Sequence, residues 1–398
     1  MADVDIRALA PAATETLFVT ARKVFVELLA LFFIFCAAEA AYRFYKVIRY
    51  GIADYPDAMT VGYYETDPTY GIVPKKNFSS EQIPKKLRNE PTLKISFGAH
   101  YTTNSRGFRG PEVAVPKPPD VYRVVVIGDS STFSLELNDD ETWPAVLQAL
   151  LQGDADFLKA HGAQRVEVVN ASGGGWRTRE ELIRLKEEIP PLQPDLVLSA
   201  VSWNDAYKGI QGIDPEKARI PQKPWVRRVK IFENLWIRMD NLKSADKSTQ
   251  EELRKKLVRD SRWAEVCVRN LKEMDQICRT MGSDFRLVDL PGLCRSGISL
   301  DSEEFRAITS RTRVNAQIYP LWVDLKTMMS SLFRETEIPV IDVHKAFETF
   351  TGPDRVSLFM DEMHTTAPGA REIAGVVHSF LKLEIDKLRA GSRGERRE

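Results

Sequence analysis

Five short runs of β-branched and apolar residues limit most strongly what this chain can fold into. Such runs suit strands that are buried on both faces of a sheet. Stretches with apolar residues at helical spacing lie between and after them. Strands and helices alternate, so we predict an α/β fold with three layers, in which helices cover both faces of a parallel sheet of about five strands. The runs are Arg123–Gly128, Arg165–Asn170, Asp195–Val201, Phe285–Leu290 and Pro339–Val343, and the helical stretches are Glu141–Gln152, Thr178–Glu188, Trp263–Thr280, Val314–Arg334 and Ala370–Leu388.

The charge balance and the cysteine count exclude other classes of protein. The 398 residues include 56 Lys and Arg and 56 Asp and Glu. The formal net charge is therefore zero, so the protein has no overall positive charge that would attract nucleic acid, and we expect no nucleic-acid partner. The four cysteines are too few for a dense disulfide scaffold and lie in no cluster with zinc spacing, so we expect no metal and no cofactor. We expect Cys267, Cys278 and Cys294 to be buried free thiols, with at most one disulfide through Cys294.

The segment Val24–Ala41 is apolar on every helical face and carries only two charged residues. Because a helix crosses a bilayer with about 17 to 25 mostly apolar residues, we predict a transmembrane helix. Glu39 can pair with Arg43 one turn further on, as the interfacial end of a retained helix. Two alternatives stay open. One is a buried core helix, and the other is a cleaved signal peptide, for which Ala38-Glu39-Ala40 resembles a cleavage site.

The first predicted strand ends in Gly128-Asp129-Ser130. Ligands of doubly wound sheets bind beyond the carboxyl ends of the strands, so the Ser130 hydroxyl can point into the binding crevice. A serine at this place can also be a simple helix N-cap. We interpret Asp129 as structural, an acceptor of backbone hydrogen bonds within its own turn. A nucleophilic serine needs a base and an oxyanion hole, which the other strand ends must supply.

The next two strand ends offer candidate donors for an oxyanion. The second strand ends in a loop from Asn170 to Gly175 with three glycines, which allow close backbone approach to a ligand. A nucleotide site is disfavoured, because Thr178 occupies the last glycine position of Gly-x-Gly-x-x-Gly. The third strand ends in Ser202-Trp203-Asn204-Asp205, where Asn204 can offer an amide N–H. A polar turn is the alternative there.

Asp361-Glu362-Met363-His364 precedes the last predicted helix. A carboxylate three residues before an imidazole can hold one ring nitrogen protonated, which leaves the other to accept a proton from a serine. His344 has Asp342 nearby, but we interpret it as a structural residue at a strand end. The remaining histidines lack such a partner and are interpreted as surface or packing residues; they are His100, His161 and His378.

These four blocks, each after a strand end and in this order, resemble those of the SGNH/GDSL hydrolase superfamily. The resemblance runs from Arg123 to Leu388 and implies a flavodoxin-like fold. It also implies a set of roles: Ser130 as nucleophile, His364 as base, Asp361 as the residue that orients it, and an oxyanion hole made by the amides of Ser130 and Gly175 and the side chain of Asn204. Ser172 and Ser202 stand where many members have glycine. Asp67–Gly71 and Asn104–Gly110 resemble the segment that precedes this domain in membrane-anchored bacterial members.

We therefore expect four parts: an N-terminal tail and anchor in residues 1–49, an extended segment containing strands in 50–119, the SGNH hydrolase domain in 120–390 and a flexible basic tail in 391–398. Residues 206–261 form an insertion, read either as a lid over the crevice or as an amphipathic helix on the body or the membrane surface. Positive charges on the two sides of the anchor balance. We expect a single-pass membrane protein with a periplasmic catalytic domain, because one N-terminal anchor is usually an export device.

The expected function is that of a serine esterase or acyl hydrolase. Its expected substrate is an acylated small molecule or polysaccharide, in particular an O-acyl group on a cell-surface polysaccharide. Two alternatives remain. An O-acyltransferase would use the same Ser-His-Asp site and pass the acyl group to a sugar hydroxyl. A glycan-binding or assembly component would have no turnover. The sequence leaves the oligomeric state open.

Overall fold

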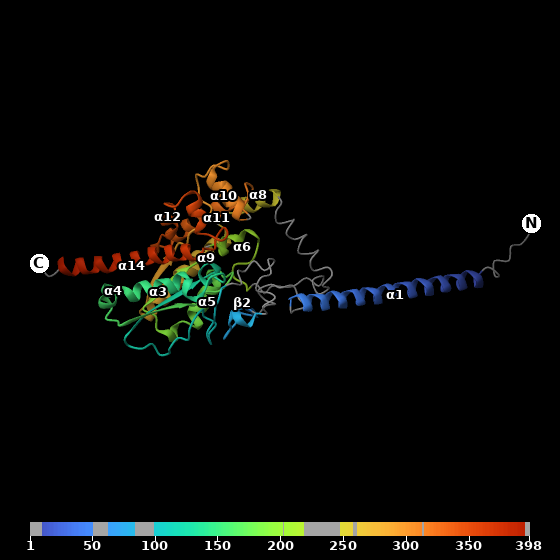
Figure 1. Ribbon diagram of the computed structural model, residues 1–398, viewed down its shortest axis with the longest axis horizontal. Coiled ribbons are helices and arrows are strands. Elements are labelled where there is room, and N and C mark those ends of the chain that lie inside the picture. The colour runs from blue at the N-terminus through green and yellow to red at the C-terminus, as the bar shows by residue number, and fades with distance from the viewer. Residues whose placement is uncertain are drawn as a thin grey trace, which may run out of the picture. The chain divides into compact units, whose positions relative to one another are not determined.

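The computed structural model describes residues 10–50, 63–83, 99–201, 203–218, 247–257, 261–312 and 314–394. Ser202 and most of the predicted insertion lie outside these residues, so the structure does not test the lid. The chain divides into two compact units, one with the N-terminal helix and one with the α/β body (Figure 1).

The N-terminal helix α1 spans Ala10–Tyr50. Its stretch Phe18–Arg49 is the one helix in the described part of the chain that is long and apolar enough to cross a membrane. Large apolar side chains along it are exposed, which favours a membrane-spanning or signal helix over a buried core helix. Glu39 and Arg43 form the predicted ion pair at 2.8 Å.

The sheet of the body has five parallel strands in the order β4-β3-β5-β6-β7. Counted from β3 as the first strand, this is the order 2-1-3-4-5 of flavodoxin-like folds, which confirms the predicted fold. The central strand β3 is apolar because both of its faces are covered, and Val124 and Val125 are fully buried. The five strands are β3 (Val121–Gly128), β4 (Arg165–Asn170), β5 (Leu196–Ala200), β6 (Asp284–Val288) and β7 (Val340–Ile341).

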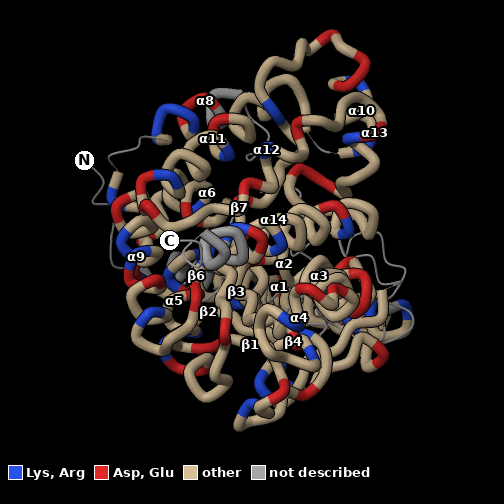
Figure 2. Tube along the Cα trace, turned by 90° about the vertical axis from the view of Figure 1, so that its left-hand side faces the viewer, with Lys and Arg blue, Asp and Glu red and all other residues tan. Residues whose placement is uncertain are grey.

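Helices cover both faces of this sheet (Figure 2). On one side α3 packs against α14 and β4, and on the other α5 packs against α9, which also contacts β6. The α-helices of the body are α2 (Ser130–Phe133), α3 (Trp143–Gly153), α4 (Ala155–Ala160), α5 (Thr178–Glu187), α6 (Asn204–Ile210), α8 (Lys247–Lys255), α9 (Arg262–Met281), α10 (Glu303–Arg311), α11 (Tyr319–Glu335), α12 (Val343–Phe347), α13 (Gly352–Ser357) and α14 (Ala367–Gly394). Short 3-10 helices are η2 (Ser80–Gln82), η4 (Asp139–Glu141) and η5 (Pro190–Leu192).

One predicted helix begins later than expected. The stretch Val314–Arg334 was predicted to be helical throughout, but α11 starts at Tyr319. Pro320 occupies the first turn, where its missing N–H costs nothing and its fixed φ suits a helix start. Before it, the Asn315 side chain accepts hydrogen bonds from the amides of Gln317 and Ile318, at 2.9 and 3.1 Å, and forms a turn.

The segment before the domain contains the predicted strands. β1 (Tyr64–Asp67) and β2 (Gly71–Pro74) pair as an antiparallel hairpin. Asp67 Oδ1 accepts hydrogen bonds from the amides of Thr69 and Tyr70 at 2.7 and 2.9 Å, which stabilises the turn.

The cysteines of the body, Cys267, Cys278 and Cys294, are buried free thiols, as expected.

Candidate active site

Ser130 lies where the central strand β3 passes directly into the short helix α2. Asp129 caps α2, because its Oδ1 accepts the amide of Ser131 at 2.8 Å. Gly128 is required by close packing at this point: a Cβ there would lie 2.7 Å from Thr132 Oγ1 and 3.1 Å from the carbonyl of Ala200. Asp129 is fully buried, whereas Ser130 is partly exposed. The serine hydroxyl is therefore held at the carboxyl edge of the sheet by a rigid turn.

His364 and Asp361 reach this serine from a loop far along the chain. His364 Nε2 lies 2.9 Å from Ser130 Oγ, and His364 Nδ1 lies 2.7 Å from Asp361 Oδ2. The other oxygen, Asp361 Oδ1, accepts the amides of Met363 and His364 at 2.9 and 2.7 Å. An antiparallel bridge closes the loop, in which the amide of Met360 donates to the carbonyl of His364 at 2.8 Å. The carboxylate thus orients the ring, and the ring faces the hydroxyl.

The charges around the imidazole favour its protonated form. Burial lowers the pKa of His364, but the negative charges of Asp361, Glu136 and Asp129 and the hydrogen bond that the imidazole donates to Asp361 outweigh burial and raise that pKa. Burial raises the pKa of Asp361, but His364 and the two backbone amides outweigh this and lower it. The imidazole is therefore a strong proton acceptor beside the hydroxyl.

Asn204 is also brought to the serine turn. It is the first residue of α6, it is 8% exposed, and its Nδ2 donates to Asp129 Oδ2 at 3.2 Å. A carboxamide nitrogen carries two hydrogens, so one remains after this bond. Asp129 therefore joins its own turn to the end of β5. The expectation that it accepts backbone hydrogen bonds within its turn is met by the Ser131 amide.

The glycine loop after β4 packs closely on the same turn. Asn170 Nδ2 donates to the carbonyl of Thr132 at 2.9 Å, and the amide of Gly173 donates to the carbonyl of Gly128 at 3.0 Å. Gly175 has φ of +72°, a left-handed conformation that glycine adopts without strain. The ammonium group of Lys208 on α6 donates to the carbonyl of Gly175.

Two serines stand where many SGNH/GDSL members have glycine. The first, Ser172, donates its hydroxyl to Asn170 Oδ1. Ser202 lies outside the described residues.

Three residues near the site were not identified from the sequence: Arg109, Lys208 and Glu136. The buried guanidinium of Arg109 donates to the carbonyls of Phe133, Ser134 and Leu137, and so fixes the chain that follows α2. The Glu136 carboxylate acts on His364 through its charge, and its Oε2 is buried without a hydrogen-bond partner in the described part of the chain. Only Arg109 carried a signal, because it lies in the Asn104–Gly110 motif.

The histidines outside the site have other surroundings. His344 lies in α12, and its amide donates to the carbonyl of Asp289 at 2.8 Å. The expectation that His100 and His378 lack a carboxylate partner is wrong. His100 Nε2 lies 3.6 Å from Glu81 Oε1, and His378 Nε2 lies 3.1 Å from Asp154 Oδ2. His378 and Asp154 are 224 positions apart and meet because α14 packs beside α4. Within the described ranges, no group of three or more His, Cys, Asp or Glu residues is arranged to hold a metal.

The chain is similar to one esterase in part of its sequence and to several solved hydrolase structures. No protein-family model matches the chain. An arylesterase from Vibrio mimicus is 33% identical over 87 residues, which are 22% of this chain and 40% of that protein. This chain therefore matches less than half the length of that relative.

Among solved structures, an alpha/beta hydrolase from the metagenome of Lake Arreo, Spain, is 15% identical, with a TM-score of 0.38 over 66% of this chain and 95% of that one. An acetylxylan esterase from Geobacillus stearothermophilus is 14% identical, with a TM-score of 0.38 over 65% of this chain and 94% of that one. A lipase/acylhydrolase from Enterococcus faecalis is 16% identical, with a TM-score of 0.37 over 66% and 96% of the two chains.

The chain resembles the SGNH/GDSL hydrolases. The name of the partly matching Vibrio mimicus protein, an arylesterase, agrees with the resemblance predicted from the four motifs. Identity to the solved structures is low, so the role of each residue in an SGNH/GDSL-type reaction must rest on the geometry of this chain itself.

Proposed function

We propose that the protein is a serine esterase or acyl hydrolase of the SGNH/GDSL type. The arrangement of Ser130, His364 and Asp361 supports this most directly, with 2.9 Å between hydroxyl and imidazole and 2.7 Å between imidazole and carboxylate. Such an arrangement lets a serine lose its proton to the imidazole as it attacks, while the carboxylate stabilises the imidazolium that forms. Ser130 is the proposed nucleophile, His364 the base and Asp361 the orienting residue.

The reaction proceeds in two halves. Ser130 Oγ forms a bond to the acyl carbon while its proton moves to His364 Nε2. The ester C–O bond then breaks, and the leaving alcohol takes that proton. In the second half a water loses a proton to His364 Nε2 as its oxygen bonds to the acyl carbon. The bond between that carbon and Ser130 Oγ then breaks, His364 returns the proton to Oγ, and the carboxylic acid leaves.

The negative charge that develops on the carbonyl oxygen needs donors that are already in place. We propose that the amides of Ser130 and Gly175 and the side chain of Asn204 supply them. Asn204 retains one amide hydrogen beyond its bond to Asp129, and Lys208 restrains the peptide that follows Gly175. These contacts support the assignment because they limit how far each donor can move.

The proposed setting is the cell surface. We infer that α1 anchors a domain of residues 120–390 in the membrane, with this domain in the periplasm, and that the substrate is an O-acylated surface polysaccharide. A membrane-tethered hydrolase meets such polymers where they are exported or assembled. The apolar helix Phe18–Arg49 is the observation that supports anchoring.

Ester hydrolysis by the full-length chain in detergent tests the proposal. Wild type should hydrolyse p-nitrophenyl acetate, and Ser130→Ala and His364→Ala should lose that activity. Ser131→Ala is the matched control, because Ser131 Oγ makes no hydrogen bond within the described residues and only its amide binds Asp129. Acetyl release from an acetylated polysaccharide, measured with and without a sugar acceptor, separates hydrolysis from transfer. The proposal fails if Ser130→Ala retains the wild-type rate.

A further inference from the structure

A polar cavity of about 210 Å³ lies beyond the carboxyl ends of β6 and β7, apart from the Ser130 site. It is lined by the loop after β6, one face of α11 and the start of α12. Carboxyl ends of parallel strands are where such sheets bind ligands. The volume is below the ~300–1,000 Å³ typical of sites for drug-sized molecules, so a small group fits better.

The cavity lining is rich in cations. Arg295, Lys326 and Arg334 line it, against Glu348 as the one carboxylate among its lining residues. Arg295 is paired with Glu304 at 3.0 Å, and the buried Lys326 donates to Asp289. Arg334 makes no ion pair within the described part of the chain. An ammonium group carries three hydrogens, so Lys326 keeps donors beyond this one bond.

Two buried polar atoms of the lining residues have no hydrogen-bond partner among the residues that the structure describes. Ser330 is 5% exposed, and its Oγ makes no hydrogen bond to any described residue. His344 Nδ1 is also buried and unpaired in that same part of the chain. Lys326, Ser330 and Arg334 are spaced by four residues along α11 and so lie on one face of it. Unsatisfied buried polar groups cost free energy, which a ligand or an ordered water that bonds to them would recover.

Three of the four charges that act most on His344 are positive. Burial and the nearby charges of Lys326, Arg355 and Arg334 lower the pKa of His344 to about 3, against the opposing charge of Asp342. The imidazole is therefore neutral at physiological pH and can donate one N–H. Arg355 is one of these positive groups, and within the described residues the hydrogen bonds of its guanidinium go to the backbone carbonyls of Gly292, Leu293 and Phe347.

We propose that this cavity binds a phosphate group, with Arg334 and Lys326 as its charged partners and Ser330 and His344 as neutral donors. A tetrahedral oxyanion has enough acceptor oxygens to satisfy several converging donors at once, and charged donors make the stronger bonds. The cavity is linked to the proposed active site, since Leu293, next to the lining residue Cys294, donates its amide to the carbonyl of Glu362 at 3.1 Å. Glu362 lies between Asp361 and His364.

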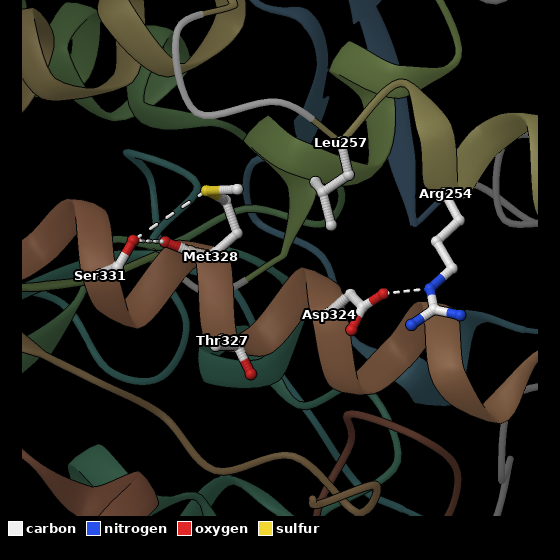
Figure 3. Close-up of a pocket in the computed structure, with 6 residues that line it drawn as sticks. All are labelled: Arg254, Leu257, Asp324, Thr327, Met328 and Ser331. Carbon is white, nitrogen blue, oxygen red and sulfur yellow. Dashed lines mark hydrogen bonds and ion pairs between the residues drawn. The ribbon is translucent and has the colours of Figure 1, made fainter.

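Calorimetric titration of the full-length chain with inorganic phosphate, at neutral pH and constant ionic strength, tests the site. Wild type should bind one phosphate per chain. Arg334→Gln and Ser330→Ala should each weaken binding about tenfold. The matched control is Arg254→Gln, which removes an equal charge from a neighbouring groove, where Arg254 of α8 pairs with Asp324 of α11 (Figure 3). This control should leave phosphate affinity within about twofold of wild type.

Two further titrations show whether the cavity is separate from the proposed active site and which form of phosphate it binds. Ser130→Ala should bind phosphate as wild type does, because the cavity is not the proposed active site. Titration with glycerol 3-phosphate distinguishes a site for phosphoryl groups, which binds both ligands, from a site for the free anion, which binds inorganic phosphate alone. Absence of saturable phosphate binding, equal loss in Arg254→Gln and Arg334→Gln, or loss in Ser130→Ala would overturn the proposal. Unchanged unfolding temperatures without phosphate show that the variants are folded.

Discussion

Asn204 donates its side-chain amide to Asp129 at 3.2 Å, and the same carboxylate accepts the Ser131 amide at 2.8 Å. One buried carboxylate therefore joins the turn that carries the proposed nucleophile to the residue proposed to bind the oxyanion. The ends of β3 and β5 are neighbours in the sheet, so this contact follows from the strand order. It holds the Asn204 amide in place before any substrate binds.

Replacement of Asn204 by alanine should slow the chemical step. Loss of one preorganised oxyanion donor typically costs about 10²- to 10³-fold in kcat, and we expect a fall of this size with little change in KM. Steady-state kinetics on p-nitrophenyl acetate measure both constants. A change confined to KM would show that Asn204 binds the ground state instead.

Asp361→Asn should change the pH dependence as well as the rate. The Asp361 charge raises the pKa of His364, so in wild type the free base is lost as pH falls through a value above the ordinary 6.5. Without that charge the acidic limb of the kcat/KM profile should move to lower pH, and kcat should fall by about 10⁴-fold. A profile whose acidic limb stays at the wild-type position would show that Asp361 does not set the protonation of His364.

Lys208→Met should reduce kcat without unfolding the protein. Lys208 holds the carbonyl of Gly175, and small displacements of catalytic groups can cost up to about 10²-fold in rate. Kinetics and the thermal unfolding midpoint are measured together. Lys208→Arg, which can still donate to the carbonyl, should recover part of the rate. An unchanged kcat in Lys208→Met would exclude a positioning role for this contact.

Arg109→Met should act on stability. Its buried guanidinium donates to the carbonyls of Phe133, Ser134 and Leu137 and pairs with Asp139 at 3.1 Å. The Ser134 carbonyl would keep the amide of Leu137, and each buried group left unsatisfied costs about 1–3 kcal/mol. We expect the free energy of unfolding to fall by about 3 kcal/mol or more, measured by urea denaturation. The control is Arg106→Met, three residues earlier and only half-buried, which should change stability by less than about 0.5 kcal/mol.

The sheet was predictable because its signals are local. β3 is a run of valines and isoleucine that is recognised as a buried strand without knowledge of its neighbours. The start of α11 was misplaced because apolar spacing extends before Tyr319, whereas Pro320 and the Asn315 turn decide the boundary. Such a boundary depends on one or two residues rather than on a period.

The site was only partly predictable. Ser130, Asn204 and His364 each follow a strand end or precede a helix, so their position in the pattern reveals them. Arg109 and Lys208 act through long side chains that reach backbone carbonyls 24 or more residues away in sequence. Neither the periodicity of apolar residues nor the spacing of a motif predicts a contact between residues so far apart in the sequence. The partner of His378 was missed for the same reason.

The most direct test of the account is the identity of the residue that an active-site phosphonylating reagent modifies. Full-length protein treated with a fluorophosphonate and digested should carry one adduct, on Ser130, and His364→Ala should lose it while Ser131→Ala keeps it. An adduct on another residue, or labelling of Ser130 at the wild-type rate in His364→Ala, would contradict the claim that the imidazole activates this hydroxyl.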